Sequence, residues 1–282
     1  MNISLDCIPC IANSFLGLLK SGILPEEEKE SAMRHLLDYL SRANYQQSPP
    51  ALGRQMHRLI REVLKNPDPY KEIKEKYNRM MLGFYEEFKN RVHTAGDPFD
   101  MAMRLAIAGN VIDFGPQHQL DIMETIDRVV KTQLAIDNSP RLRRDLEKAS
   151  TVLYVGDNCG EIVLDKLFIE TIGHPNVYFA VRGAPVINDA TLEDARKIGM
   201  NNVARIVTTG DDAPGAVWET ASGEFKELLM DADVVISKGQ GNLEGLIDVK
   251  HNIYFLLVTK CDLIANRVGA KTGDFIVKNA LE

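Results

Sequence analysis

Five short runs of β-branched and other apolar residues, spaced along the second half of the chain, constrain its fold more than any other feature. Each run is followed by a segment long enough for an amphipathic helix. Runs that are apolar throughout are typical of strands buried on both faces of a parallel sheet, because the connecting helices cover those faces. The runs are TVLYV (151–155), NVYFAV (176–181), ARIVT (204–208), DVVIS (233–237) and IYFLLV (253–258). We therefore predict a doubly wound, mainly parallel α/β domain of the Rossmann-like kind over residues 148–282.

The first half of the chain has a helical periodicity instead. Apolar residues recur at intervals of three and four, most clearly over residues 70–93, where they alternate with Lys, Glu and Arg. Similar stripes, separated by segments that contain Pro, Gly or Asp, cover residues 7–19, 26–40, 52–64, 99–108 and 120–130. We therefore predict an all-helical domain over residues 1–147.

Charge and cysteine content limit the partners and the compartment. Among 282 residues, 33 Lys and Arg stand against 40 Asp and Glu, a formal net charge of −7. This balance disfavours binding to nucleic acid or to an acidic membrane face, and favours a small metabolite or a protein. No segment has the ~18 consecutive apolar residues of a membrane span, and no signal peptide is recognisable. Four cysteines fit a reducing compartment, so we expect a cytoplasmic protein.

Polar residues with ligand chemistry follow the predicted strands. In an open α/β sheet, ligands bind beyond the carboxyl ends of the strands. The loops after the first two predicted strands carry Asp157, Asn158 and Asp189, and the fourth strand is followed by Lys238 among glycines. Oxygen donors from Asp and Asn select a hard divalent cation such as Mg²⁺ or Mn²⁺, whereas a lysine beside glycines suits a phosphate. The combination indicates phosphoryl chemistry, with the cation neutralising phosphate oxygens and polarising a water or leaving oxygen.

Structural interpretations compete with the ligand role in these loops. Asn158 followed by Glu161 resembles a capping box, so the first loop could simply start a helix. In the second loop, the segment 191–194 offers its own helix start, which leaves Asn188 and Asp189 without a capping role. The second loop therefore favours a ligand site more than the first.

Three segments in this order resemble the signature segments of the damage-control phosphatase family. They are GDNCGEIVLD (156–165), VRGAPVINDA (181–190) and ISKGQGN (236–242). This metal-dependent family is also called domain of unknown function eighty-nine, and a disputed acidic-residue methyltransferase activity has been associated with it. The resemblance extends to AIAGNVIDFG (106–115) and to LDCIPC (5–10), which is similar to a microbial branch with a CxxC.

The resemblance implies a cytosolic phosphatase that hydrolyses small phosphorylated metabolites, such as damaged or surplus sugar phosphates, with a bound Mn²⁺, Mg²⁺, Co²⁺ or Ni²⁺. By matching positions, Asp157, Asn158 and Asp189 would hold the metal and Lys238 would anchor phosphate. Residues that would contact the substrate or support the ligands are Asn110, Asp113, Glu161, Arg182, Asn188, Ser237 and Gly239. The sequence leaves the nucleophile, the physiological substrate and the oligomeric state open.

The CxxC of Cys7 and Cys10 permits a zinc or redox interpretation. Structural zinc generally needs four ligands, and the other two cysteines, Cys159 and Cys261, stand singly at strand ends. We therefore expect two buried thiols on an apolar helix.

Two other functions compete with a phosphatase. The segment VLYVGDNCG loosely resembles the glycine-rich loop of a methyltransferase or dehydrogenase that binds a nucleotide cofactor. However, Asn158 stands where a central glycine is needed, and Arg182 follows the second strand where an acidic residue would bind ribose. An S-adenosylmethionine-dependent carboxyl methyltransferase and a non-catalytic metabolite-binding module remain the alternatives.

Overall fold

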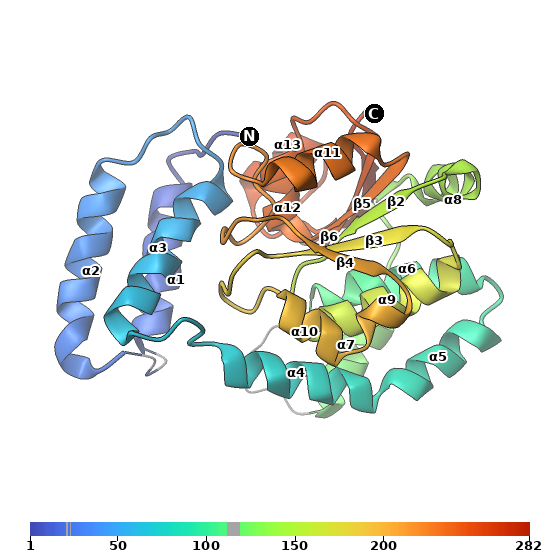
Figure 1. The fold of residues 1–282 in the computed structure, drawn as a ribbon, viewed down its shortest axis with the longest axis horizontal. Coiled ribbons are helices and arrows are strands. Elements are labelled where there is room, and N and C mark those ends of the chain that lie inside the picture. Colours follow the sequence, from blue (N-terminus) through green and yellow to red (C-terminus); the bar gives the residue numbers. More distant parts are fainter. Residues whose placement is uncertain (21, 23, 112–118) are drawn as a thin grey trace.

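The protein is a mixed α/β molecule built around one seven-stranded sheet (Figure 1). The structure, a computed structural model, describes residues 1–282 except 21, 23 and 112–118. The strands are β1 (Ile136–Asp137), β2 (Val152–Val155), β3 (Val177–Val181), β4 (Arg205–Thr208), β5 (Val234–Lys238), β6 (Ile253–Val258) and β7 (Phe275–Asn279). The α-helices are α1 (Cys7–Lys20), α2 (Glu26–Ser41), α3 (Pro49–Leu64), α4 (Lys71–Gly83), α5 (Tyr85–Thr94), α6 (Pro98–Gly109), α7 (Gln119–Lys131), α8 (Ser139–Lys148), α9 (Glu161–Ile172), α10 (Leu192–Lys197), α11 (Gly223–Asp231), α12 (Gly239–Leu246) and α13 (Asp262–Val268).

The strand order confirms the predicted doubly wound topology. Across the sheet the order is β1-β7-β6-β5-β2-β3-β4, and strands β2 to β6 pair in parallel. The chain runs outward from β2 through β3 to β4, then returns to β5 beside β2 and continues to β6. The carboxyl ends of β2 and β5 therefore form the topological switch point, where sheets of this kind bind ligands.

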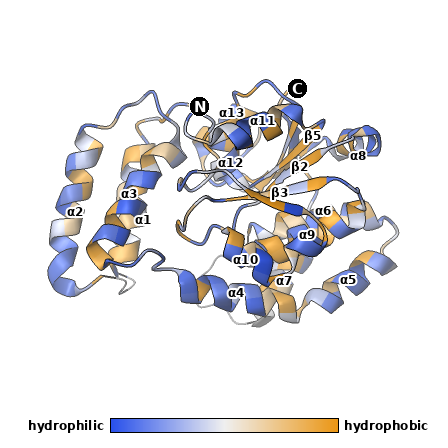
Figure 2. Ribbon diagram, in the orientation of Figure 1, coloured by the Kyte–Doolittle hydropathy of each residue, from blue (hydrophilic) through white to orange (hydrophobic). Residues whose placement is uncertain are grey.

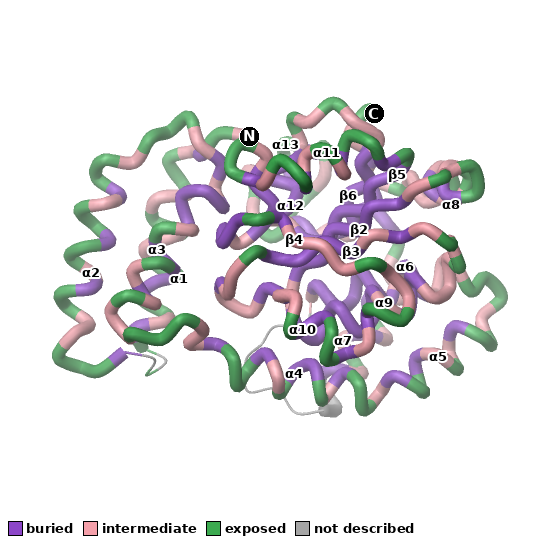
Figure 3. Tube along the Cα trace, in the orientation of Figure 1, coloured by how far each residue is buried: buried purple, intermediate pink, exposed green. Residues whose placement is uncertain are grey.

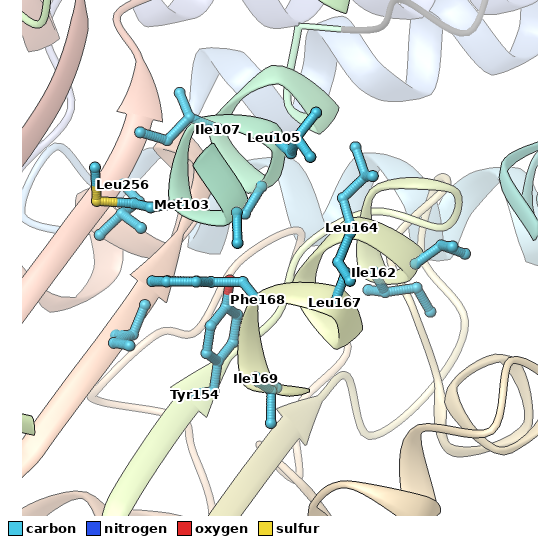
Figure 4. Packing of buried hydrophobic residues seen from close by; sticks show 14 of the residues in the cluster. Met103, Leu105, Ile107, Tyr154, Ile162, Leu164, Leu167, Phe168, Ile169 and Leu256 are labelled. Atoms are coloured by element: carbon cyan, nitrogen blue, oxygen red, sulfur yellow. The ribbon is translucent and has the colours of Figure 1, made fainter. Parts of the chain in front are cut away.

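Helices cover both faces of the sheet, as the apolar runs predict. Alternate residues of β2 enter different cores: Val152 and Tyr154 pack with α6 and α9, whereas Leu153 and Val155 pack with α11, α12 and α13. Strands β2, β5 and β6 are buried along their whole length (Figure 3), and the centre of the sheet is largely coloured hydrophobic in Figure 2, whereas the edge strand β4 has no fully buried residue. Figure 4 shows the first of these cores, in which Tyr154 lies beside Phe168 of α9.

The helical half divides into two parts. Helices α1 to α3 have a hydrophobic core of their own and lie together at one side of the molecule (Figure 1). Helices α4 to α8 instead share the core of the sheet, through residues such as Phe88, Leu105 and Leu142. A division into independent units at residue 147 stays a prediction, which separately expressed fragments would test.

Some elements differ from those predicted. The stripe over residues 70–93 forms two helices, α4 and α5, which meet at Phe84. Strand β7 runs antiparallel to β6, and the two-residue β1 extends the sheet beyond it, so one edge of the sheet comes from outside the five predicted strands. No helix in the described part of the chain is long and apolar enough to span a bilayer.

Candidate active site

The switch point brings together the loops that follow β2 and β5. Asn242 of α12 donates hydrogen bonds from Nδ2 to the carbonyl oxygens of Gly156 (3.0 Å) and Lys238 (2.6 Å), which ties the two loops. Gly239 has a left-handed φ of 77°, and a Cβ at this position would collide with Asp157 Oδ2. Only glycine allows this backbone conformation together with such a close approach.

Arg182 joins the carboxylates of the two acidic loops. Its Nε donates to Asp189 Oδ2 (2.6 Å) and its Nη2 donates to Asp157 Oδ1 (3.0 Å). A backbone bridge between Asn158 and Asp189 holds the loops side by side. The predicted trio of Asp157, Asn158 and Asp189 therefore lies together, around a guanidinium group whose own Nη1 is buried without a hydrogen-bond partner among the described residues.

Carboxamide groups connect the loops to the helical half. Asn110, which follows α6, donates from Nδ2 to Asp157 Oδ2 (3.1 Å) and to both oxygens of Glu161. Asn158 donates to the same two carboxylates, at 2.9 Å and 3.0 Å. The capping-box interpretation of Asn158 and Glu161 is wrong, because α9 has Gly160 as its N-cap and the Asn158 side chain binds carboxylates.

Asn78 of α4 is a site residue that the sequence analysis missed. Its Oδ1 accepts a hydrogen bond from the backbone N–H of Gly160 (2.6 Å), which fixes the end of the first loop. The available signal was a polar residue inside the apolar stripe of residues 70–93, because a buried carboxamide needs a specific partner.

Lys238 is completely buried, and all three of its protons go to protein acceptors. These are the carbonyl oxygen of Ala106 (2.7 Å), Glu161 Oε1 (2.6 Å) and Asp165 Oδ1 (2.7 Å). An ammonium group has three donors, so a phosphate would have to replace one of these partners. The direct contact between Lys238 and phosphate stays a prediction.

The buried network carries more carboxyl groups than cationic groups. Its members are the carboxyl groups of Asp157, Glu161, Asp165 and Asp189 and the cationic side chains of Arg182 and Lys238. Burial, followed by the charges of Asp189 and Glu161, raises the pKa of Asp157 to about 8. Burial also raises the pKa of Asp189, although Arg182 opposes the shift. The network thus holds two more carboxyl groups than cationic groups, and ionisation of all four carboxyl groups is opposed unless a further positive charge is bound.

Glu161 and Asp165 differ in how they respond to Lys238. Burial would raise the pKa of Glu161, but the Lys238 charge and hydrogen bonds from Lys238 and Asn110 outweigh it, and the pKa is lowered. For Asp165 burial prevails over Lys238, and its pKa is raised to about 6. The ammonium therefore favours the ionised form of Glu161 most strongly.

The donor set fits a hard divalent cation. Asn110 Oδ1 is buried and has no hydrogen-bond donor among the described residues. Carboxylate and carboxamide oxygens are ligands that Mg²⁺ and Mn²⁺ prefer, and a divalent ion would favour ionisation of the carboxyl groups that are in excess over the cationic groups. The described side chains form no cluster of three or more His, Cys, Asp or Glu already arranged for a metal. A metal here would therefore depend on the carboxamides as well as the carboxylates.

The remaining predicted site residues have varied positions. Ser237 is buried, and its Oγ has no partner among the described residues. Asn188 is half-buried, and it follows Ile187, whose φ of 41° is unusual for a β-branched residue and indicates strain in this loop. The prediction that residues 191–194 start a separate helix is confirmed, since Thr191 caps α10 with a capping box. Asp113 lies outside the described residues.

The two cysteines of the CxxC are not both buried, contrary to our expectation. Cys7 is half-buried and Cys10 is exposed at the start of α1. Partial desolvation raises the pKa of Cys10, and the charges of Cys261, Cys7 and Glu244 add to the shift. All four cysteines are free thiols.

A second charged network, between α3 and the loop after β4, was also missed. Arg54 donates to both oxygens of Asp211 at 2.9 Å, and Arg58 and Arg61 both pair with Asp212. Arg61 also donates to the carbonyl oxygen of Pro185 in the second acidic loop (2.5 Å). We call these five charged residues the α3 junction. Arginines with this spacing along a helix also suit a solvated face, so the contact could not be predicted from their positions in the sequence.

Comparison with known proteins identifies the family. The model of the damage-control phosphatase ARMT1-like domain matches residues 3–276. The chain belongs to the damage-control phosphatase family. A damage-control phosphatase from Pyrococcus horikoshii is 31% identical over 98% of this chain and 97% of its own length. A second, from Archaeoglobus fulgidus, is 33% identical over 83% of this chain and 84% of its own length.

A further relative and a solved structure match nearly the whole chain. An uncharacterized protein from Methanocaldococcus jannaschii is 31% identical over 96% of this chain and 93% of its own length. The Pyrococcus horikoshii protein named above has a crystal structure, described as that of a DUF89 family protein, which superimposes with a TM-score of 0.92 at 31% identity, over 99% of both chains. Membership in the damage-control phosphatase family confirms the predicted resemblance and supports a phosphatase role on damaged metabolites.

Proposed function

We propose that this protein is a divalent-metal-dependent phosphatase that hydrolyses phosphomonoesters of small metabolites, including sugar phosphates. The observation that carries the proposal is the unbalanced buried network at the switch point, where two carboxyl groups lack a counter-charge. A buried surplus of charge is costly unless something bound offsets it. A divalent cation and the phosphate that it attracts fit both the site and the family.

In this proposal Asp157, Asn158 and Asp189 hold the metal, with Mn²⁺, Mg²⁺, Co²⁺ and Ni²⁺ as candidates. When bound, the metal would act as a Lewis acid that neutralises charge on the phosphoryl oxygens. Asn110 and Glu161 keep the Asp157 carboxylate in place through the hydrogen bonds described above. The nucleophile is left unassigned.

The protein's own donors would bind the phosphoryl group. Arg182 presents a buried Nη1 that has no partner in the described part of the chain, and this group can donate to a phosphoryl oxygen while Nε and Nη2 keep their carboxylates. Helix α12 begins at Gly239, so its first backbone N–H groups have no helical acceptor and suit an anion. Ser237, whose buried hydroxyl has no partner among the residues that the structure describes, is a further donor next to this turn. Lys238 would contribute positive charge from behind the site.

A phosphate-release assay tests the proposal. The purified protein would be screened against a panel of sugar phosphates with each of the four metals, and each reaction would be paired with a chelator control. We expect release that requires metal and that Asp189→Ala abolishes without loss of the folded state. Metal-independent release, or full turnover in Asp189→Ala, would reject the assignment.

No feature of the site favours the competing functions. Arg182, rather than an acidic residue, follows β3 where a ribose-binding carboxylate would lie, and it is occupied by Asp157 and Asp189. An equilibrium titration with S-adenosylmethionine separates the methyltransferase alternative, since tight binding without metal would support it. We also propose a cytoplasmic location, which the four free thiols support and cell fractionation would test.

A further inference from the structure

A buried chain of hydrogen bonds leads from the middle of the sheet to the candidate metal site. Tyr154 of β2 donates from its hydroxyl to Asp165 Oδ1 (2.7 Å), and Lys238 donates to the same oxygen (2.7 Å). Lys238 also donates to Glu161 Oε1 (2.6 Å), and Glu161 accepts from Asn110 and Asn158. Tyr154, Asp165 and Lys238 are fully buried. The proposed function assigns no role to Tyr154 and counts Asp165 only as one of the buried carboxyl groups.

We propose that Tyr154 and Asp165 are positioning residues. They determine how the hydrogen bonds of the Lys238 ammonium are divided between Asp165 and Glu161, and they thereby hold Asp157 in its metal-binding position. The proposal rests on the proposed function, because it assigns these residues to the same site. Neither residue touches the metal or the substrate.

All three protons of the Lys238 ammonium already have protein acceptors. Its third proton goes to the carbonyl oxygen of Ala106 within α6, so the ammonium is anchored on one side and has no spare donor. Glu161 and Asp165 lie one turn apart on α9, on the same face of the helix. A change in the hydrogen bonding of Asp165 must therefore be taken up at Glu161.

Two carboxamide groups connect Glu161 to Asp157. The Nδ2 groups of Asn110 and Asn158 each donate to Glu161 and also to Asp157 Oδ2. Each carboxamide thus bridges the carboxylate that faces Lys238 and the carboxylate that would bind the metal. Movement of Glu161 is transmitted to Asp157 by two parallel routes.

The Tyr154 hydroxyl can be removed without disturbing the packing. The ring stacks on Phe179 with centroids 5.6 Å apart and makes an edge contact with Phe168, and both contacts involve the ring alone (Figure 4). The hydroxyl serves only Asp165, whose Oδ2 has no partner among the described residues. Tyr154→Phe therefore changes the hydrogen-bond chain and little else.

Tyr254 provides a matched control. It is a buried tyrosine of β6 in the same hydrophobic core, and its hydroxyl donates to the Asp145 carboxylate of α8 at 2.5 Å. Asp145 has no hydrogen bond to the site network among the described residues. Tyr254→Phe also removes a hydrogen bond from a tyrosine to a carboxylate, but this bond is not connected to Asp157 among the described residues.

The test compares Tyr154→Phe, Tyr254→Phe and wild type by Mn²⁺ titration, by kcat and KM for phosphate release, and by thermal unfolding. We expect similar small decreases in Tm for both variants. Only Tyr154→Phe should raise the Kd for Mn²⁺ and lower kcat, each about three- to tenfold, below the effect of removing a group that contacts a metal ligand directly. KM should stay within about twofold, because the substrate contacts are intact.

Equal Mn²⁺ affinity and kcat in the two variants would overturn the inference, since the hydroxyl would then only stabilise the fold. Wild-type protein that binds none of Mn²⁺, Mg²⁺, Co²⁺ and Ni²⁺ would overturn the proposed function together with this inference, whereas equal behaviour of the two variants in a protein that binds metal overturns the inference alone. Asp165→Asn gives a second measurement, because it keeps the shape and the Tyr154 hydrogen bond but removes a charge facing Lys238. We expect its Kd for Mn²⁺ to rise about 10- to 100-fold, and an unchanged Kd would also contradict the inference.

Discussion

The switch-point network and the α3 junction are both built from paired acidic and basic side chains, but acidic groups are in excess in the first and basic groups in the second. The first has four carboxyl groups for two cationic groups, and the central Lys238 is completely buried. The second has three arginines for two aspartates, and the Arg58 side chain is 46% exposed. Water screens a surplus charge at the junction but not inside the sheet. The difference suggests that the first network exists to bind something, whereas the second holds α3 against the sheet domain.

Asp157→Asn should cause the largest loss of phosphate release, and it tests whether the switch-point network binds a metal. The variant would remove one of the proposed ligands, so metal-dependent phosphate release should fall by more than about 100-fold, beyond the loss caused by changing a supporting residue. It should leave Tm unchanged or higher, because burial with Asp189 and Glu161 raises the pKa of Asp157 to about 8 and makes its charge unfavourable at neutral pH. Parallel assays of phosphate release and thermal unfolding check both expectations. A large drop in Tm with normal release would show that Asp157 is structural.

Gly239→Ala should cause the next largest loss of phosphate release. A methyl group at this position would displace the Asp157 carboxylate. Gly269→Ala is the matched control, because Gly269 has a similar φ of 81° against 77° but nothing within 4 Å of a Cβ. Both variants should lose about 1 kcal/mol of stability from left-handed strain, and Gly239→Ala should lose more than Gly269→Ala because it also displaces a buried carboxylate. Only Gly239→Ala should lower kcat, by roughly tenfold or more, as expected when a catalytic group shifts by an ångström or so. Equal activity in the two variants would show that Asp157 can move without consequence.

The sequence predicts much of the first network because its residues follow strands. Continuous apolar runs identify buried strands, and parallel strands place Asp157, Asn158 and Asp189 at one edge of the sheet. The order of β2 and β5 then makes that edge the switch point. Local pattern and general topology were therefore sufficient to locate these loops.

The supporting residues could not be predicted in the same way. Tyr154 lies within an apolar run and Asp165 within a helix, so each has an ordinary structural explanation until the contacts are known. The α3 junction joins residues about 150 positions apart in the chain, and the spacing of its arginines equally suits a solvated face. The partners of Lys238 come from two helices and so could not be inferred from the loop that contains it.

His57 tests how the α3 region responds to acid. Burial, with a further contribution from Arg61, lowers the pKa of His57 to about 3, although Asp212 opposes the shift, and neither ring nitrogen has a partner among the described residues. The unfolded chain takes up this proton near pH 6.5 and the folded chain does not, so stability should fall with decreasing pH by up to roughly 1.4 kcal/mol per unit. The fall attributable to His57 should begin near pH 6.5 and end near pH 3.

His57→Leu should reduce this sensitivity to acid. Urea unfolding at pH 7.5 and pH 5.0 would measure it, with a smaller difference between the two values in the variant than in wild type. At pH 7.5 the variant should be at least as stable as wild type, because two unpaired buried nitrogens are removed. Phosphate release at pH 7.5 should be unchanged. An identical pH dependence of unfolding in both proteins would show that His57 does not titrate in this way.

Asp212→Asn should give the smallest effect and tests the second half of the comparison. Burial opposes the shift, but hydrogen bonds from Arg58 and Arg61 lower the pKa of Asp212 to about 2. Its contribution to stability is therefore complete above the unfolded pKa near 4 and disappears as pH falls toward 2. At neutral pH we expect a loss of about 1 kcal/mol in the free energy of unfolding, because the pairs are partly exposed, and a smaller loss at high salt.

Asp38→Asn is the control, since Asp38 pairs with Arg42 on the surface of α2, where a pair of exposed side chains contributes little. Because Arg61 also binds Pro185 of the second acidic loop, a fall in phosphate release as large as that of Asp157→Asn would make the junction part of the site.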